Sequence, residues 1–191
     1  MAQNQLLKFS PDLTDERLCI LCDHLLDTIH NSTEDSSSVD DTPWTKGCLA
    51  YGRIQGLLKR LVSENQYVWL KLANSTMDFT AKIDSTHIQF VIDDPYNPKK
   101  SHRLQPNSVE NIQLSIDLEE YEQIKVVIWR LFITIDKDNR ELEPTATVVG
   151  FDSNTIELCR WEYNETIKVP VSSPLTIPAE IEEPKLQLKK R

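Results

Sequence analysis

The chain of 191 residues is long enough for one domain with extensions. At this length, with an apolar fraction of 39%, the chain can bury a core that needs no disulfide or metal ion to stabilise it. The 30 acidic and 21 basic residues give a net charge of −9, which argues against a nucleic-acid-binding protein, because such proteins use a basic surface to displace counterions from phosphates. The sequence shows no secretory signal, and no run reaches the roughly 18 apolar residues of a membrane helix. We therefore expect a cytoplasmic protein without a membrane segment.

The first predicted element is a helix from about Thr14 to His30. Thr14 suits the N-cap, and Asp15 and Glu16 place negative charge on the first turn, where the helix dipole favours it. Apolar residues recur at helical spacing: Leu18, Leu21, Cys22, Leu25, Leu26 and Ile29. The following segment, 31–42, is polar, acidic and serine-rich, which predicts a mobile loop.

Cys19 and Cys22 form a C-x-x-C pair inside this predicted helix. Zinc sites usually take two such pairs from turns, and redox pairs stand at a helix start that follows a strand. Because this pair lies on an apolar helix face with no second pair, core packing of two thiols is the favoured interpretation. Zinc binding stays an alternative, and we predict no cofactor.

A second helix is predicted to begin near Thr42 and Pro43 and to end near Glu64 and Asn65. Thr42 suits the N-cap, and proline is well tolerated at the first helical position. The residues expected on its buried face share helical spacing: Trp44, Cys48, Tyr51, Ile54 or Gln55, Leu58, Leu61 and Val62. Two amphipathic helices thus precede the rest of the chain.

Three of the four glycines, Gly47, Gly52 and Gly56, lie in this second helix. Each costs about 0.5–1 kcal/mol of helix stability relative to alanine, which suggests a compensating role. Gly52 and Gly56 share a face, so a smooth strip there would allow the close approach of the first helix or of a second copy. A homo-oligomer through this helix is therefore one prediction. The alternative is a helix that is kinked or starts later.

From Gln66 onward the apolar residues recur with a period of two, which predicts strands. A meander of three strands is expected at 67–73, 77–83 and 87–92. Further strands are expected at 111–118, 124–135, 145–151 and 155–163, the last two forming a hairpin. For 117–130 a helix is the alternative, because Asp117 and Glu120 fit a capping box.

These elements predict an α+β fold, with two N-terminal helices packed beside a mainly antiparallel sheet that could be a half-barrel or a sandwich. We expect an N-terminal helical part at 1–65 and a β-rich body of the same domain at 66–169. The segment 170–191 contains prolines and a basic end, which predicts an extended, weakly ordered tail.

The predicted loop 93–108 carries the strongest candidate site of the sequence. Asp93 and Asp94 open it, and a basic group follows: Lys99, Lys100, His102 and Arg103. Paired acids can hold a metal, and basic residues can hold phosphate. The favoured interpretation is a solvated loop, the first alternative is a contact with phosphate or an acidic partner, and catalysis has less support.

No catalytic or nucleotide-binding motif stands out, since the chain has neither a G-x-S-x-G sequence nor a glycine-rich phosphate loop. The leading hypothesis is a non-enzymatic protein–protein interaction module: an adaptor, assembly factor or regulatory subunit. The acidic loop, the glycine strip and the proline-rich tail are places where a partner could bind. The alternatives are a metal-dependent hydrolase or nuclease using scattered acids (Asp78, Asp84, Asp93 and Asp94) and a nucleic-acid or small-ligand binding domain.

Overall fold

The computed structural model of the chain describes residues 5–36, 38–112, 127–135 and 143–164. The helices whose full bounds lie within these residues are η1 (Gln5–Lys8), α1 (Asp15–Asp35), α2 (Pro43–Ser63) and η2 (Ser101–Arg103). The strands are β1 (Leu70–Asn74), β2 (Thr80–Ile83), β3 (Thr86–Ile92), β4 (Ile128–Thr134), β5 (Thr145–Phe151) and β6 (Glu157–Glu162). The predicted α+β class is confirmed, with the two long helices ahead of the sheet.

The strands of the described residues form one open sheet in which they lie in sequence order, from β1 to β6. All neighbours are antiparallel except β3 and β4, which are parallel. A parallel pair needs a crossover connection of a dozen or more residues, and the chain between β3 and β4 is long enough for one. The mainly antiparallel sheet is confirmed, and it is a single sheet rather than a sandwich.

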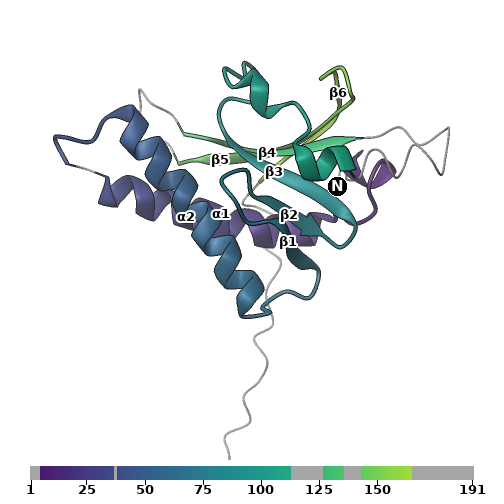
Figure 1. The fold of residues 1–191 in the computed structure, drawn as a ribbon, viewed down its shortest axis with the longest axis horizontal. Coiled ribbons are helices and arrows are strands. Elements are labelled where there is room, and N and C mark those ends of the chain that lie inside the picture. The colour runs from purple at the N-terminus through teal and green to yellow at the C-terminus, as the bar shows by residue number, and fades with distance from the viewer. Residues whose placement is uncertain (1–4, 37, 113–126, 136–142, 165–191) are drawn as a thin grey trace, which may run out of the picture.

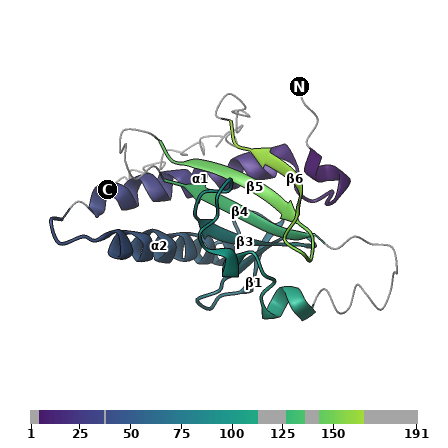
Figure 2. The same ribbon diagram turned by 90° about the horizontal axis from the view of Figure 1, so that it is seen from above.

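Helices α1 and α2 pack together and cover one face of the sheet (Figures 1 and 2). The buried side chains of this layer come from both helices and from the sheet residues that face them, among them Leu25, Leu58 and Leu131, each with no exposed surface. These residues form the larger core of the molecule. Among the described residues, no helix is both long and apolar enough to cross a membrane.

Both helices begin where the sequence predicts. The Thr14 hydroxyl accepts a hydrogen bond from the Arg17 backbone N–H at 3.4 Å, and that of Thr42 accepts one from the Thr45 N–H at 3.2 Å. Each cap satisfies a backbone N–H that has no partner within the first helical turn. Pro43 follows Thr42 at the start of α2. The predicted end of α2 near Glu64 is confirmed as well.

Helix α1 continues to Asp35, five residues past its predicted end at His30. The polar residues after His30 do not end it, because Ser32 and Thr33 donate their hydroxyls to backbone carbonyls four residues earlier, at 2.8 and 3.0 Å. Ser32 is buried in the process. The acidic loop is therefore shorter than the predicted 31–42.

Trp44 and Cys48 were expected on the buried face of α2, but both are exposed, Trp44 with 75% of its surface accessible. The fully buried residues of α2 begin at Ala50. The first two turns thus extend past the core, where helical spacing no longer predicts burial.

The meander is confirmed as β1–β3, and the hairpin as β5 and β6. The strand predicted at 111–118 is wrong at its start, because residues 108–112 are helical. A capping box explains this: the Asn107 N–H donates to the Glu110 carboxylate, and the Glu110 N–H donates to the Asn107 side chain, both at 2.9 Å. Most of 117–130 and all of the predicted tail 170–191 lie outside the described residues.

The second face of the sheet is covered by the loop that follows β3, on the side opposite α1 (Figure 1). Leu104 of this loop packs into a smaller apolar cluster with five sheet residues: Val91, Ile128, Phe132, Val149 and Phe151. The loop is thus folded onto the sheet, and it brings the predicted basic group with it.

Candidate functional site

A row of three buried polar residues crosses the sheet on this second face. Thr80 of β2 is paired with Gln89 of β3, and Gln89 is paired with Arg130 of β4. Their exposed fractions are 0%, 4% and 0%. Buried polar side chains need hydrogen-bond partners, so each member of this row requires one.

The partners of Arg130 come from the loop and the short helix above it. Its guanidinium makes a bidentate ion pair with Glu110, at 2.6 and 3.0 Å, and Glu110 is itself buried. It also donates to the backbone carbonyls of Arg103 at 2.5 Å and Gln105 at 2.8 Å. Because several charge-assisted bonds converge on one side chain, Arg130 holds residues 103–110 in a fixed position on the sheet.

Thr80 is satisfied from the same segment. The Asn107 side-chain amide donates to the Thr80 hydroxyl at 2.6 Å, while its oxygen accepts the bond from Glu110 that starts the short helix. The loop therefore supplies hydrogen-bond partners for Thr80 and Arg130, the two residues at the ends of the polar row.

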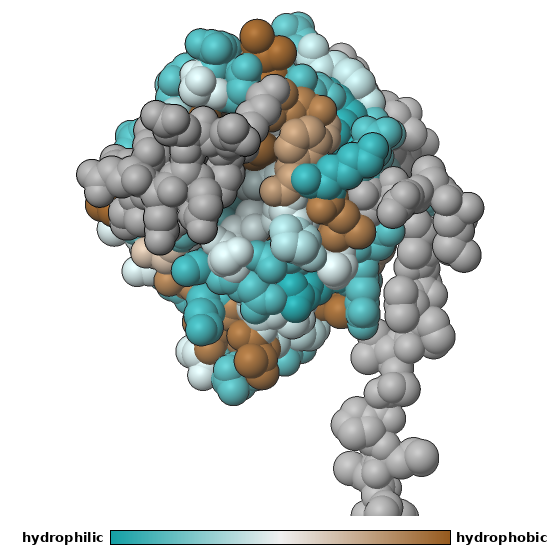
Figure 3. Space-filling view, turned by 90° about the vertical axis from the view of Figure 1, so that its right-hand side faces the viewer, coloured by the Kyte–Doolittle hydropathy of each residue, from teal (hydrophilic) through white to brown (hydrophobic). Residues whose placement is uncertain are grey.

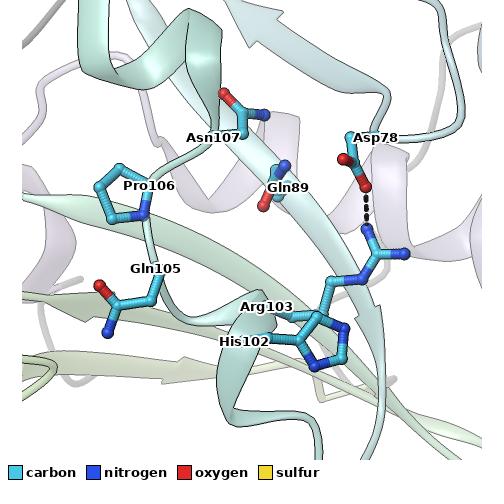
Figure 4. A pocket seen from close by; sticks show the side chains of 7 residues that line it. All are labelled: Asp78, Gln89, His102, Arg103, Gln105, Pro106 and Asn107. Atoms are coloured by element: carbon cyan, nitrogen blue, oxygen red, sulfur yellow. Dashed lines mark hydrogen bonds and ion pairs between the residues drawn. The ribbon is translucent and has the colours of Figure 1, made fainter.

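Gln89, in the middle of the row, is different. Among the residues that the structure describes, none exchanges a hydrogen bond with its side-chain amide. The amide opens instead into a pocket of about 260 Å³. Seven residues line it: Asp78, Gln89, His102, Arg103, Gln105, Pro106 and Asn107. Figure 4 shows Gln89 near the middle of this ring, rising from β3 beneath the loop.

One side of the pocket rim is an ion pair. Arg103 donates to the Asp78 carboxylate at 2.5 Å (Figure 4). Its guanidinium also lies 5.3 Å from the centre of the Tyr51 ring. The Tyr51 hydroxyl donates to the Met77 carbonyl at 2.9 Å, and burial raises its pKa above the ordinary value. The positive charge of Arg103 is therefore already balanced at the rim.

The four residues of the predicted basic group, Lys99, Lys100, His102 and Arg103, do not all lie at the pocket. His102 and Arg103 line the pocket. Lys100 instead shapes the loop, because its ammonium donates to the Ile92 carbonyl at 2.9 Å and its backbone N–H donates to Asp93 at 2.8 Å. Lys99 is exposed and does not line the pocket.

The acids proposed as metal ligands have other partners. Asp93 and Asp94 accept backbone N–H bonds within their own turn, at 3.0 and 2.8 Å. Asp78 pairs with Arg103, and Asp84 pairs with Arg17 at 2.7 Å. Within the described ranges, no three histidine, cysteine or acidic side chains come together as a metal site would need.

Gly52 and Gly56 are exposed on α2, and a Cβ added at either would meet no atom within 4 Å. The expected close approach of α1 to this strip is therefore wrong. Of the other alternative, a helix that is kinked or starts later, the later start is also wrong, because α2 runs from Pro43. Contact with a second copy stays a prediction.

Cys19 and Cys22 are both buried in the core between α1 and its neighbours. Burial raises the pKa of both thiols, that of Cys22 well above its ordinary value. A buried, protonated thiol is a poor ligand and a poor nucleophile. Core packing, the favoured interpretation, agrees with this placement.

Exposed large apolar side chains are spread over several elements: Leu7, Phe9, Val39, Trp44, Val68, Met77, Tyr96, Ile112 and Ile156. On the side shown in Figure 3, hydrophobic side chains form separate patches bordered by hydrophilic ones. The pocket at Gln89 is thus a more specific candidate site than an apolar surface.

Three key residues of this site, Gln89, Glu110 and Asn107, were not predicted, and Arg130, which stands beside Trp129 and could belong to a recognition face, was not linked to them. One signal was present, since Asn107 and Glu110 have capping-box spacing in the sequence. No family model, curated protein or solved structure matches this chain.

Proposed function

We propose that this protein is a non-enzymatic interaction module that binds a partner protein at the pocket surface, defined as the seven residues that line the pocket and the adjacent Met77. The observation that carries the proposal is the buried Gln89 amide, which lacks a partner in the described chain and opens into the pocket. A binding surface that presents a donor and an acceptor without protein partners gains specificity from the group that pairs with both.

The size and surroundings of the pocket favour a protein over a separate small molecule. Its volume of about 260 Å³ lies below the roughly 300–1,000 Å³ of typical small-molecule sites, and it suits a single inserted side chain. Met77, which directly precedes the pocket residue Asp78 in the chain, has 76% of its surface exposed. Apolar side chains beside a polar anchor point are typical of protein interfaces.

The fixed loop also supports binding. Arg130 and Glu110 hold the loop against the sheet through buried bonds, so little conformational entropy remains to be lost when a partner binds. Preorganisation of this kind raises affinity without new contacts. The proposal places the protein in the cytoplasm, where its four free cysteines would stay reduced.

Site-specific photo-crosslinking tests this proposal. The crosslinking residue p-benzoylphenylalanine is introduced in place of His102 at the pocket and, as a control, in place of the exposed Asp27 on α1. We expect one partner protein to be captured in cells from position 102 and not from position 27, and excess unlabelled protein to compete. Equal products from both positions, or none from position 102, would contradict the proposal.

A small-ligand-binding domain is the second candidate, because the same pocket could enclose a small polar molecule. Native mass spectrometry of the purified full-length protein distinguishes the two. A retained small molecule that is lost on replacement of Gln89 would favour this second candidate.

A further inference from the structure

The hydrogen-bonding pattern of the pocket identifies the chemistry of the group it accepts. From the geometry we infer that the pocket receives the side-chain carboxamide of an asparagine or glutamine from the partner protein, paired edge to edge with Gln89. This inference rests on the proposed function, and it adds the residue type that the partner must insert.

The first argument is the position of Gln89. The neighbours of Gln89 in the polar row have their partners in residues 103–110: Thr80 accepts a bond from Asn107, and Arg130 donates to Arg103, Gln105 and Glu110, at 2.5–3.0 Å. Asn107 uses its side chain on Thr80 and Glu110, so it is occupied. Gln89 is left with a donor and an acceptor, side by side on one amide plane, at the floor of the pocket.

The second argument is the local charge. Sequence reasoning suggested phosphate or an acidic partner for the basic group, but Arg103 already pairs with Asp78 and lies over Tyr51. An anion would have to displace Asp78 from Arg103. A neutral group has no such competitor, so the pocket favours a neutral ligand with both a donor and an acceptor.

The third argument is shape. A single trans peptide unit points its N–H and C=O in opposite directions, so it cannot pair with both groups of Gln89. An extended residue could do so through the N–H and C=O that flank its Cα, but a pocket of about 260 Å³ suits an inserted side chain better than a length of extended backbone. A primary carboxamide presents a donor and an acceptor on the same edge and forms two hydrogen bonds with another amide. An adenine edge has the same pattern, but the net charge of −9 disfavours nucleic acid.

The test is NMR titration of the ¹⁵N-labelled full-length protein with three probes: N-acetyl-glutamine methylamide, its glutamate counterpart and adenine. We expect the glutamine probe to bind with an affinity in about the millimolar range, as befits a single side chain. It should shift the Gln89 side-chain NH₂ signals and the backbone signals of Arg103 and Asn107. The glutamate probe should bind at least about tenfold more weakly, because its carboxylate gives the Gln89 carbonyl no donor.

Two variants test whether binding of the glutamine probe depends on Gln89. Gln89→Met keeps the side-chain length and removes both hydrogen-bonding groups, so it should abolish binding of the glutamine probe while the protein remains folded. Gln66→Leu, which removes the amide of a glutamine exposed outside the pocket, should leave binding within about twofold of the original. Unchanged binding by Gln89→Met would overturn the inference.

The probes also give distinct contrary results. Equal or tighter binding of the glutamate probe would overturn the inference in favour of an anion site at Arg103. Binding of adenine without the glutamine probe would overturn it in favour of a nucleobase, and no binding at all would overturn it outright. Crosslinking from position 102 without probe binding would refute only this inference, whereas probe binding without a crosslinked partner would refute the proposed function.

Discussion

The two faces of the sheet are covered in different ways. On the helical face, α1 and α2 bury leucines and isoleucines against apolar sheet residues, and contacts there need no particular direction. On the loop face, a small apolar cluster around Leu104 lies beside the polar row of Thr80, Gln89 and Arg130, whose bonds have fixed geometry. Adjacent residues of one strand thus have different roles: Phe90 packs in the core on the helical face, and Gln89 lines the pocket on the loop face.

This difference separates stability from recognition. Apolar burial on the helical face stabilises the fold but specifies position only loosely, because volume-conserving exchanges are well tolerated in a core. Directional bonds on the loop face hold residues 103–110 in one place, while the Gln89 amide has no partner among the described residues and opens into the pocket. The loop face is therefore the better place for a specific binding site.

The largest effect should come from breaking the buried ion pair on the loop face. Glu110→Ala leaves the guanidinium of Arg130 buried without its carboxylate, which should lower the free energy of unfolding by about 3–5 kcal/mol. Urea denaturation followed by circular dichroism measures this. The double variant Glu110→Leu with Arg130→Met removes both charges and should recover most of the loss. A cost below about 1 kcal/mol for Glu110→Ala would mean that the pair does not hold the loop.

A cavity on the helical face should have a similar but smaller cost. Leu58 of α2 has no exposed surface, and Leu58→Ala should lower the free energy of unfolding by about 3 kcal/mol. Because Leu58 and Glu110 lie on opposite faces and share no partner, their effects should add within about 0.5 kcal/mol. The glutamine probe should still bind to Leu58→Ala but not to Glu110→Ala. Loss of probe binding in both would show that the faces are not independent.

A single hydrogen bond of the polar row tests how the loop is positioned. Thr80→Val keeps the shape of the side chain but removes the acceptor of the 2.6 Å bond from Asn107. The unsatisfied amide should cost about 1–2 kcal/mol and raise amide hydrogen exchange in the loop. Thr145→Val, at an exposed position of β5, is the matched control and should change stability by less than about 0.5 kcal/mol. Equal effects of the two variants would contradict this role of Thr80.

Local patterns predicted the helical face better than the loop face. The caps at Thr14 and Thr42 and the apolar spacing of both helices are local properties of the chain, and the structure confirms them except at Trp44 and Cys48, which are exposed. Period-two alternation likewise predicted the meander and the last hairpin. Alternation does not encode which strands become neighbours, so the parallel pairing of β3 with β4 could not be predicted from it.

The candidate site was predicted only in part, because its key contacts join distant parts of the chain. His102 and Arg103 were found through the charge of their loop. Gln89 and Arg130 look like ordinary strand residues until the register of β3 and β4 places them side by side. Glu110 lies 20 residues from its partner Arg130, and no local spacing connects the two.

The smallest expected change in stability comes from substitutions at Gly56 of α2. They separate the effect of this position on the stability of one chain from its effect on self-association. A Cβ at position 56 meets nothing within 4 Å, so Gly56→Ala should stabilise the isolated chain by about 0.5–1 kcal/mol through helix propensity. Because Gly56 is exposed on α2, we expect Gly56→Leu to harm chiefly a contact with a second copy. Thermal melts with sedimentation analysis measure both properties. A higher Tm with unchanged mass means that Gly56 faces water, whereas a lower mass for Gly56→Leu means that the strip of Gly52 and Gly56 is a self-association surface.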